Sequence, residues 1–183
     1  MANRQDQREK VIQMLADHLL TAGLAQTSLR QLAAACGTSD RMLLYYFADK
    51  AEIMTLVLAR VAEQFSSALE QALPRERLPL QILLQQVSAL VRTPAMRPTM
   101  RLWLDMVAAA ARQEQPFPAI ATAILHQLMA WIEARLEGPP GPARRQRAAF
   151  LLALIDGIAI FDMTGGEAEA DAVEQALSDI LLT

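Results

Sequence analysis

The sequence predicts an all-α protein. Ala, Leu, Gln, Glu, Arg and Met dominate its 183 residues, and all six favour helices. No alternating run of Val, Ile or Thr reaches the length of a strand, whereas apolar residues recur at three- and four-residue spacing. Clusters of Pro and Gly interrupt this pattern and separate the helices. We therefore expect a small group of short helices at the N-terminus, followed by a body of longer helices.

The composition indicates a folded protein without a membrane span. Hydrophobic residues make up 53% of the chain and charged residues 20%, which excludes disorder. The single Cys36 cannot form an internal disulfide, and the first ten residues lack the apolar core of a signal peptide, so a cytoplasmic protein is expected. The longest apolar stretch, Ala148 to Phe161, contains Asp156 and is shorter than the roughly 20 residues of a membrane-spanning helix.

Capping residues and helix breakers predict where the helices begin and end. Gly23 is expected to end the first helix, and the hydroxyl groups of Thr27 and Ser39 are expected to cap the next two. Asp49 with Glu52 forms a capping-box pattern at the start of a long fourth helix. The expected helices cover residues 4–22, 28–35, 40–47, 50–73, 80–91, 95–111, 118–136, 143–163 and 168–182.

The segment from Thr27 to Ile53 has the spacing of a helix-turn-helix. Ala33 lies four residues before Gly37. Ala leaves room for a neighbouring helix, and Gly can adopt the positive φ angle of the sharp turn. The face of residues 39–46 that points away from the core is then free to enter a DNA major groove, which is wide enough for one helix. The expected buried positions are Leu29, Leu32, Cys36, Leu43 and Phe47.

The charge distribution agrees with DNA contact at the N-terminus. The chain carries a net charge of −3, which by itself argues against a nucleic-acid partner. Residues 1–50, however, hold six basic and five acidic side chains, so the remaining residues carry the net −4. Neutralisation of phosphates needs local Lys and Arg, and a slightly basic head on an acidic body fits this need.

Residues 8–53 resemble the DNA-binding region of the TetR family of transcriptional regulators. The resemblance lies in a helix ending at Gly23, then TSLRQLAAACG, TS, LLYYF and ADKAEI. It implies a three-helix DNA-binding head over residues 1–50 and a helical ligand-binding and dimerisation domain over residues 51–183. It also implies phosphate contacts from Thr27, Tyr46 and Lys50, and base or backbone contacts from Ser39, Asp40, Arg41, Met42 and Tyr45, with Arg30 as a further expected DNA-binding residue.

Three positions depart from the residues most frequent in that family, namely Thr38, Arg41 and Leu44, so no base preference is carried over. Asp40 is expected to cap a helix, because a carboxylate near phosphates lowers affinity; pairing with Arg41 or accepting from a cytosine amino group are the alternatives. Arg41 is expected to contact DNA, with a solvated surface charge as the alternative. The two adjacent tyrosines point about 100° apart, so one of them is expected to be partly buried.

The apolar helices near the C-terminus predict a homodimer. Ala148 to Phe161 is apolar nearly all round, which indicates burial in its own core and against a partner, and Gly157 would allow a close approach. A buried monomer core is the alternative. The resemblance implies that the last two helices form the dimer interface, which would hold two heads about 34 to 36 Å apart on a palindromic operator. The expected interface residues are Leu151, Leu154, Ile158, Phe161, Val173, Leu177, Ile180 and Leu181.

Bulky, polarisable residues in the middle helices predict an apolar pocket, although plain core packing would give the same spacing. The resemblance implies that the body binds a small-molecule effector, apolar or aromatic, and that His126 or Asp105 orients its polar group. The expected ligand-binding residues are Met100, Trp103, Met106, Phe117, His126 and Trp131.

The function predicted from these features is that of a dimeric repressor that leaves its operator when the effector binds. With one Cys, two distant His residues and no phosphate-binding Gly loop, the chain offers no catalytic constellation, so neither an enzyme, a metal site nor a cofactor is expected. The alternatives are a transcriptional activator with the same head and a helical protein-interaction module that does not bind DNA.

Overall fold

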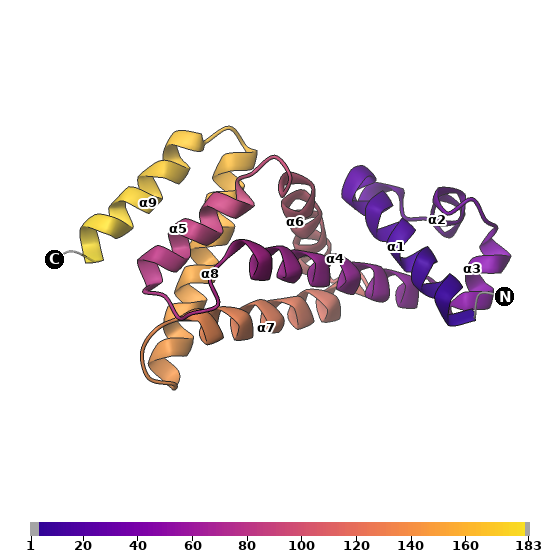
Figure 1. The fold of residues 1–183 in the computed structure, drawn as a ribbon. Coiled ribbons are helices and arrows are strands. Elements are labelled where there is room, and N and C mark those ends of the chain that lie inside the picture. The colour runs from indigo at the N-terminus through magenta and orange to yellow at the C-terminus, as the bar shows by residue number, and fades with distance from the viewer. Residues whose placement is uncertain (1–3, 182–183) are drawn as a thin grey trace. The chain divides into compact units, whose positions relative to one another are not determined.

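The computed structural model describes the backbone of residues 4–181 and the side chains of residues 4–25 and 27–176. Within these residues every regular element is a helix and no strand is formed, which confirms the predicted all-α fold (Figure 1). The elements are α1 (Arg4–Ala22), the 3-10 helix η1 (Leu24–Gln26), α2 (Leu29–Ala35), α3 (Asp40–Tyr46), α4 (Lys50–Ala72), α5 (Leu80–Val91), α6 (Arg97–Ala111), α7 (Phe117–Arg135), α8 (Pro142–Met163) and α9 (Glu167–Leu181).

Local signals set most of the helix ends. Gly23 has a φ angle of 69° and ends α1 as predicted. The cap of α2 is Ser28, whose hydroxyl accepts from the Gln31 amide while the Gln31 side chain accepts from the Ser28 amide. The prediction that Thr27 caps α2 is wrong, because the Thr27 hydroxyl donates to the Leu24 carbonyl oxygen at 3.0 Å instead.

Packing divides the described chain into two compact units. The first contains the residues up to Phe65 together with Arg101–Ile124, and the second contains Ser66–Met100 together with the residues from Leu125 onward. Helices α4, α6 and α7 each pass from one unit into the other. The head therefore shares its unit with parts of these three helices, and the functional boundary at residue 50 remains a prediction.

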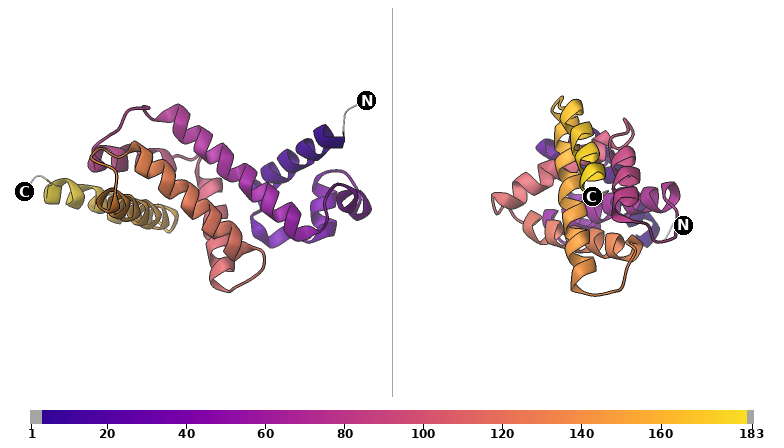
Figure 2. Two further views of the ribbon diagram at one scale, coloured as in Figure 1. Left: turned by 90° about the horizontal axis from the view of Figure 1, so that it is seen from below. Right: turned by 90° about the vertical axis from the view of Figure 1, so that its left-hand side faces the viewer.

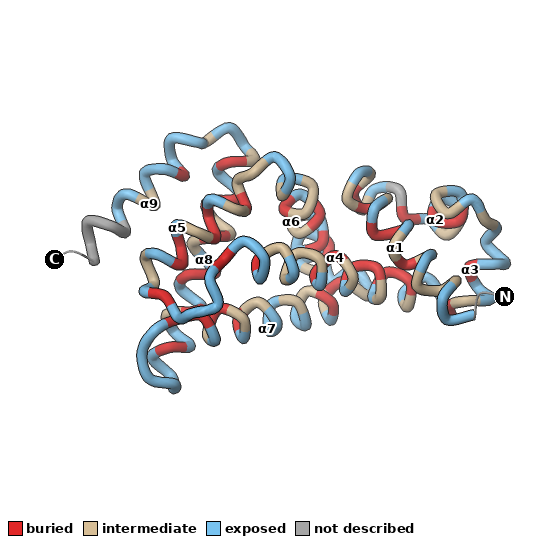
Figure 3. Tube along the Cα trace, viewed as in Figure 1, coloured by how far each residue is buried: buried red, intermediate tan, exposed pale blue. Residues whose placement is uncertain are grey.

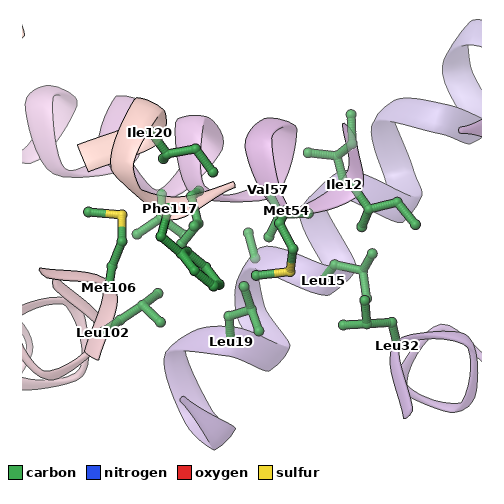
Figure 4. Close-up of a cluster of buried hydrophobic side chains, with 14 of the residues drawn as sticks. Ile12, Leu15, Leu19, Leu32, Met54, Val57, Leu102, Met106, Phe117 and Ile120 are labelled. Carbon is green, nitrogen blue, oxygen red and sulfur yellow. The ribbon is translucent and has the colours of Figure 1, made fainter. Parts of the chain in front are cut away.

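One hydrophobic core joins the helices of the first unit. Leu19 of α1, Met54 of α4 and Phe117 of α7 belong to it, and Figure 4 shows their side chains gathered in one cluster. Leu102 and Met106 of α6 extend the same cluster. Because buried apolar surface is the main favourable term in folding, α6 and α7 stabilise the head although they lie far from it in the sequence.

The second unit contains the two helices that close the chain. Helix α9 turns back along α8, and both pack against α5 (Figures 1 and 2). A polar cluster joins the three helices: the Ser88 hydroxyl hydrogen-bonds to Glu174, and the Arg92 guanidinium pairs with Asp162 at 3.4 Å and with Asp171 at 2.7 Å. The hydrogen bond to Asp171 raises the pKa of Arg92 above its ordinary value. These hydrogen bonds and ion pairs, which range from buried Asp162 to exposed Asp171, favour one position of α9 on the other two helices.

The shared core predicts unequal effects of two neighbouring substitutions in α1. Leu15 is completely buried, so Leu15→Ala should lower the free energy of unfolding by about 2–5 kcal/mol through the loss of apolar contact and the cavity left behind. Met14 is 45% exposed, and Met14→Ala should change this free energy by less than about 0.5 kcal/mol. Urea denaturation of both variants measures the difference, and equal small effects would contradict the described packing of α1.

Candidate nucleic-acid interface

The turn between α2 and α3 is closed by backbone hydrogen bonds. Gly37 has a φ angle of 61°, as its place in a sharp turn predicted. Its amide donates to the Ala34 carbonyl oxygen at 3.0 Å, and the Thr38 amide donates to the Ala33 carbonyl oxygen at 2.9 Å. This is the Schellman pattern, which satisfies the last carbonyl groups of α2. The two helices consequently leave the turn at an angle fixed by the backbone.

Helix α3 starts at a side-chain cap and is held by two buried residues. The Ser39 hydroxyl accepts from the Met42 amide at 3.3 Å, which confirms Ser39 as the cap. Asp40, for which helix capping was predicted, lies instead in the first turn, where a carboxylate favours the positive end of the helix dipole. Leu43 and Phe47 are buried in the core of the first unit. Residues on the opposite side of α3 must therefore point outward.

The outward face of α3 carries most of the residues predicted to contact DNA. Asp40, Arg41 and Met42 are exposed, and Tyr45 is 57% exposed, so the tube in Figure 3 is largely pale blue along this helix. Tyr46 is half-buried, which agrees with the expectation that one tyrosine of the pair packs inward. Exposed charged and aromatic side chains on one face of a helix can form hydrogen bonds and apolar contacts with base edges.

Two residues at this surface were missed by the sequence analysis. Leu44 is 49% exposed, and its position directly after the buried Leu43, about 100° around the helix from it, is the signal that could have identified it. The guanidinium of Arg4 lies 4.7 Å from the centre of the Tyr45 ring, and its Nη2 donates to the Tyr45 carbonyl oxygen at 2.7 Å. Arg4 and Tyr45 are far apart in sequence, so no local pattern indicates this contact.

The remaining predicted DNA-binding residues flank α3. Lys50 is exposed at the start of α4, and Arg30 is exposed on α2. Thr27 is buried and its hydroxyl is engaged by Leu24, so it does not lie on the exposed surface. At the start of α4, the Asp49 carboxylate accepts from the Glu52 amide at 2.8 Å, as the capping-box pattern predicted. The Glu52 carboxylate pairs with Arg8 of α1 at 2.6 Å and thereby joins α4 to α1.

Comparison with known proteins identifies this helix-turn-helix. The model of the family described as "Bacterial regulatory proteins, tetR family" matches residues 16–57, from the middle of α1 into α4. A transcriptional regulator from Rhodococcus sp. Rha1 is 25% identical, with a TM-score of 0.71 over 93% of this chain and 91% of that chain. Residues 16–57 therefore match the DNA-binding region of the TetR family of transcriptional regulators. This match supports DNA-binding transcriptional regulation, which is not an enzymatic activity.

More distant structures share the fold of this chain. A TetR-family transcriptional regulator from Cytophaga hutchinsonii is 18% identical, with a TM-score of 0.77 over 100% of this chain and 96% of that chain. A transcriptional regulator from Saccharomonospora viridis in complex with choline is 20% identical, with a TM-score of 0.69 over 97% of this chain and 96% of that chain. At these identities the likeness concerns the fold alone. No curated protein matches the chain significantly.

The six residues predicted to bind an effector are divided between the two units. Met106 and Phe117 are buried in the core of the first unit, and Trp103 packs against it. Met100 is buried in the second unit. The indole of Trp131 donates to Glu70 at 2.7 Å, which together with Arg135 lowers the pKa of the Glu70 carboxyl. Spacing in the sequence does not distinguish such packed residues from residues that line a pocket.

The sixth predicted residue, His126, borders an open groove in the second unit. The groove lies between α7 and α8 and has a volume of about 630 Å³. Met129 and Leu152 are buried at its floor, while His126 and Arg145 are exposed at its rim. This size falls in the range of about 300–1,000 Å³ typical of small-molecule sites. Its further lining residues include Leu125, Gln146, Ala149 and Asp156.

The predicted dimer residues fall on two different sides of α8. Leu151 and Ile158 are completely buried within the single chain, so these two predictions are corrected: an interior residue offers no surface to a partner. Leu154 is half-buried, and Phe161 is 38% exposed. Phe150 and Ile160 are exposed as well and were not predicted. On α9, Val173 is half-buried, and the side chains of Leu177, Ile180 and Leu181 lie outside the described residues.

Other types of site find no support in the described part of the chain. Residues 4–176 contain no group of three His, Cys, Asp or Glu side chains that could hold a metal ion. No described helix is long and apolar enough to cross a membrane. Cys36 is half-buried, and burial raises the pKa of its thiol, so the thiolate needed for reaction is disfavoured.

The exposed face of α3 predicts different roles for Arg41 and Lys50. Arg41→Ala should weaken binding to a preferred operator by about 1–3 kcal/mol and relax the base preference at one position, because Arg reads guanine through two hydrogen bonds. Lys50→Ala should weaken binding to all sequences alike. It should also reduce the slope of log Kd against log salt concentration by about the amount that one phosphate contact contributes. Fluorescence anisotropy at several salt concentrations measures both, and equal, sequence-independent losses would remove Arg41 from base recognition.

Proposed function

We propose that this protein is a homodimeric transcriptional repressor that binds a palindromic operator through α3 and is released by a small apolar or aromatic ligand. The observation that carries the proposal is the two-sided character of α3, which buries Leu43 and Phe47 and exposes Arg41, Met42 and Tyr45. Repression is the commoner behaviour that the family resemblance implies. A protein that acts on bacterial DNA in this way works in the cytoplasm.

The side chains of α3 suit a major groove that contains both polar and apolar base edges. Arg41, near the start of the helix, can donate two hydrogen bonds to guanine. Met42 and Leu44 are exposed apolar side chains, which fit the methyl group of thymine. Lys50 and Arg30 stand beside α3 and suit phosphate contacts, which fix the register of the protein on DNA. The Arg4 guanidinium hydrogen-bonds to the Tyr45 carbonyl oxygen and lies over the Tyr45 ring. These contacts restrain the Tyr45 side chain in the absence of DNA.

An apolar strip on the outer side of α8 supports the homodimer. Its exposed residues Phe150, Ile160 and Phe161 surround Gly157, and a contiguous apolar surface of this kind indicates an interaction site. A Cβ atom at Gly157 would meet no atom within 4 Å in the single chain. The glycine is therefore not required by packing within one chain, whereas a closely approaching partner helix would require it. A two-fold interface would place the two heads on the two halves of a palindrome.

The groove between α7 and α8 supports binding of a small ligand to the body. Its apolar floor with His126 and Arg145 at the rim fits an apolar molecule with one polar group. The regulator from Saccharomonospora viridis, which shares this fold, was solved in complex with choline, and this supports the binding of a small molecule by the body. A ligand that favours a body conformation with wrongly spaced heads would lower operator affinity by the difference between its affinities for the two conformations.

Selection from a random duplex library with the purified protein tests the proposed operator. Enrichment of a palindrome, bound with a steep dependence on salt concentration, is the expected result, because two heads contact phosphates at two half-sites. A reporter gene placed behind the selected sequence should be expressed less when the protein is present. Failure of the folded protein to enrich any sequence would contradict the proposal, and higher expression would indicate an activator.

Substitution of Gly157 tests the homodimer. Gly157→Leu should leave the fold intact, because the single chain has space there, but should shift the protein toward monomer by placing a bulky side chain in the interface. Sedimentation at micromolar concentration measures the shift. Ala134→Leu, at an exposed position of α7, is the matched control and should leave the dimer unchanged. A wild-type protein that sediments as a monomer, or a Gly157→Leu dimer as stable as wild type, would contradict this interface.

A further inference from the structure

Two charged side chains of α6 contact the chain where α1 ends and η1 begins. The Nη2 atom of Arg101 lies 3.3 Å from the carbonyl oxygen of Leu20 and 3.4 Å from that of Thr21. The Oδ2 atom of Asp105 accepts a hydrogen bond from the Leu24 amide at 3.4 Å. Arg101 and Asp105 are four residues apart, which places them on the same face of α6. One face of α6 therefore contacts the chain both before and after Gly23.

These contacts supply a positive charge and a hydrogen-bond acceptor that the local sequence does not provide. The last turn of α1 has no basic residue, although the final carbonyl groups of a helix are unpaired and partially negative. Arg101 brings a positive charge to them. Gly23 at the start of η1 offers no side-chain cap, and Asp105 provides the missing acceptor for the first amide. Both ends of the turn are thus satisfied by residues that follow about eighty positions later in the chain.

The backbone conformation of Gly23 and its lack of a side chain suit these contacts. Its φ angle of 69° favours glycine, and a Cβ atom there would lie only 2.8 Å from the Asp105 carboxylate. A side chain at residue 23 would therefore strain the backbone and would displace the Asp105 carboxylate from its present position.

We propose that Arg101 and Asp105 are positioning residues that fix the orientation of the DNA-reading head on α6. The inference rests on the proposed binding of DNA by α3. Helix α1 packs against α2, and α2 is joined to α3 by the closed turn at Gly37, so the end of α1 orients the recognition helix. Leu102, between the two charged residues, is buried in the core shared with α1. The apolar core holds α6 and the head together, while the two polar contacts define their angle.

Operator binding by full-length variants tests this role. Arg101→Ala and Asp105→Ala should each weaken binding to the selected operator by about ten-fold, because the head then samples orientations that do not fit both half-sites. The slope of log Kd against log salt concentration should stay unchanged, since no phosphate contact is lost. The preference for one half-site spacing should broaden when operators with different spacers are compared, a change that lower stability alone would not produce. Arg101→Lys should restore part of the affinity.

Arg112 provides the control. It is exposed just after α6 and pairs with Glu114 at 2.5 Å, so Arg112→Ala should bind the operator within about two-fold of wild type. Should Asp105→Ala fail to fold, Asp105→Leu keeps about the size of the side chain and removes the acceptor for the Leu24 amide, and it should weaken operator binding in the same way. Wild-type affinity and spacing preference in the Arg101 and Asp105 variants would overturn the inference, and a reduced salt slope for Arg101→Ala would show a direct phosphate contact instead. Failure of the wild-type protein to bind any operator would reject the proposed function itself.

Discussion

The burial of apolar residues of the head against α6 and α7 is the constraint on which the DNA-binding surface depends. Helix α3 has only seven residues, and a helix of that length is not stable alone in water. It is held because Leu43 and Phe47 enter the core that also contains Leu102 and Phe117. The same burial determines which residues of α3 remain exposed to solvent. The chemistry that α3 offers to DNA thus follows from the packing beneath it.

Polar contacts give this apolar core a defined geometry. Hydrophobic burial is not directional, so it holds the helices together without fixing their angles. The pair of Glu52 with Arg8 and the contacts of Arg101 and Asp105 add direction at the two ends of α1. In the second unit, Arg92 and its carboxylate partners do the same for α9. A regulator that contacts DNA through a short helix needs fixed angles between that helix and the helices that support it.

Local signals made much of the head predictable from sequence. Gly37 and Ser39 act through their own backbone neighbourhood, so their roles follow from residue type and spacing. Thr27 and Ser28 are adjacent hydroxyl residues, and sequence alone does not decide which caps α2. Contacts between distant segments, such as that of Asp105 with Leu24, leave no local pattern. On α8, an apolar surface nearly all round concealed which side faces the core, and the choice of Leu151 and Ile158 as interface residues failed for that reason.

Whether the exposed face of α3 enters the major groove is tested most directly by methylation interference on the selected operator. Methylation of guanine N7 places a group in the major groove, where an inserted helix would meet it. Interference is expected at guanines in two half-sites about one helical turn apart, and Arg41→Ala should abolish it at the guanine that Arg41 contacts. Binding that is indifferent to N7 methylation but blocked by a minor-groove ligand would contradict DNA recognition by α3.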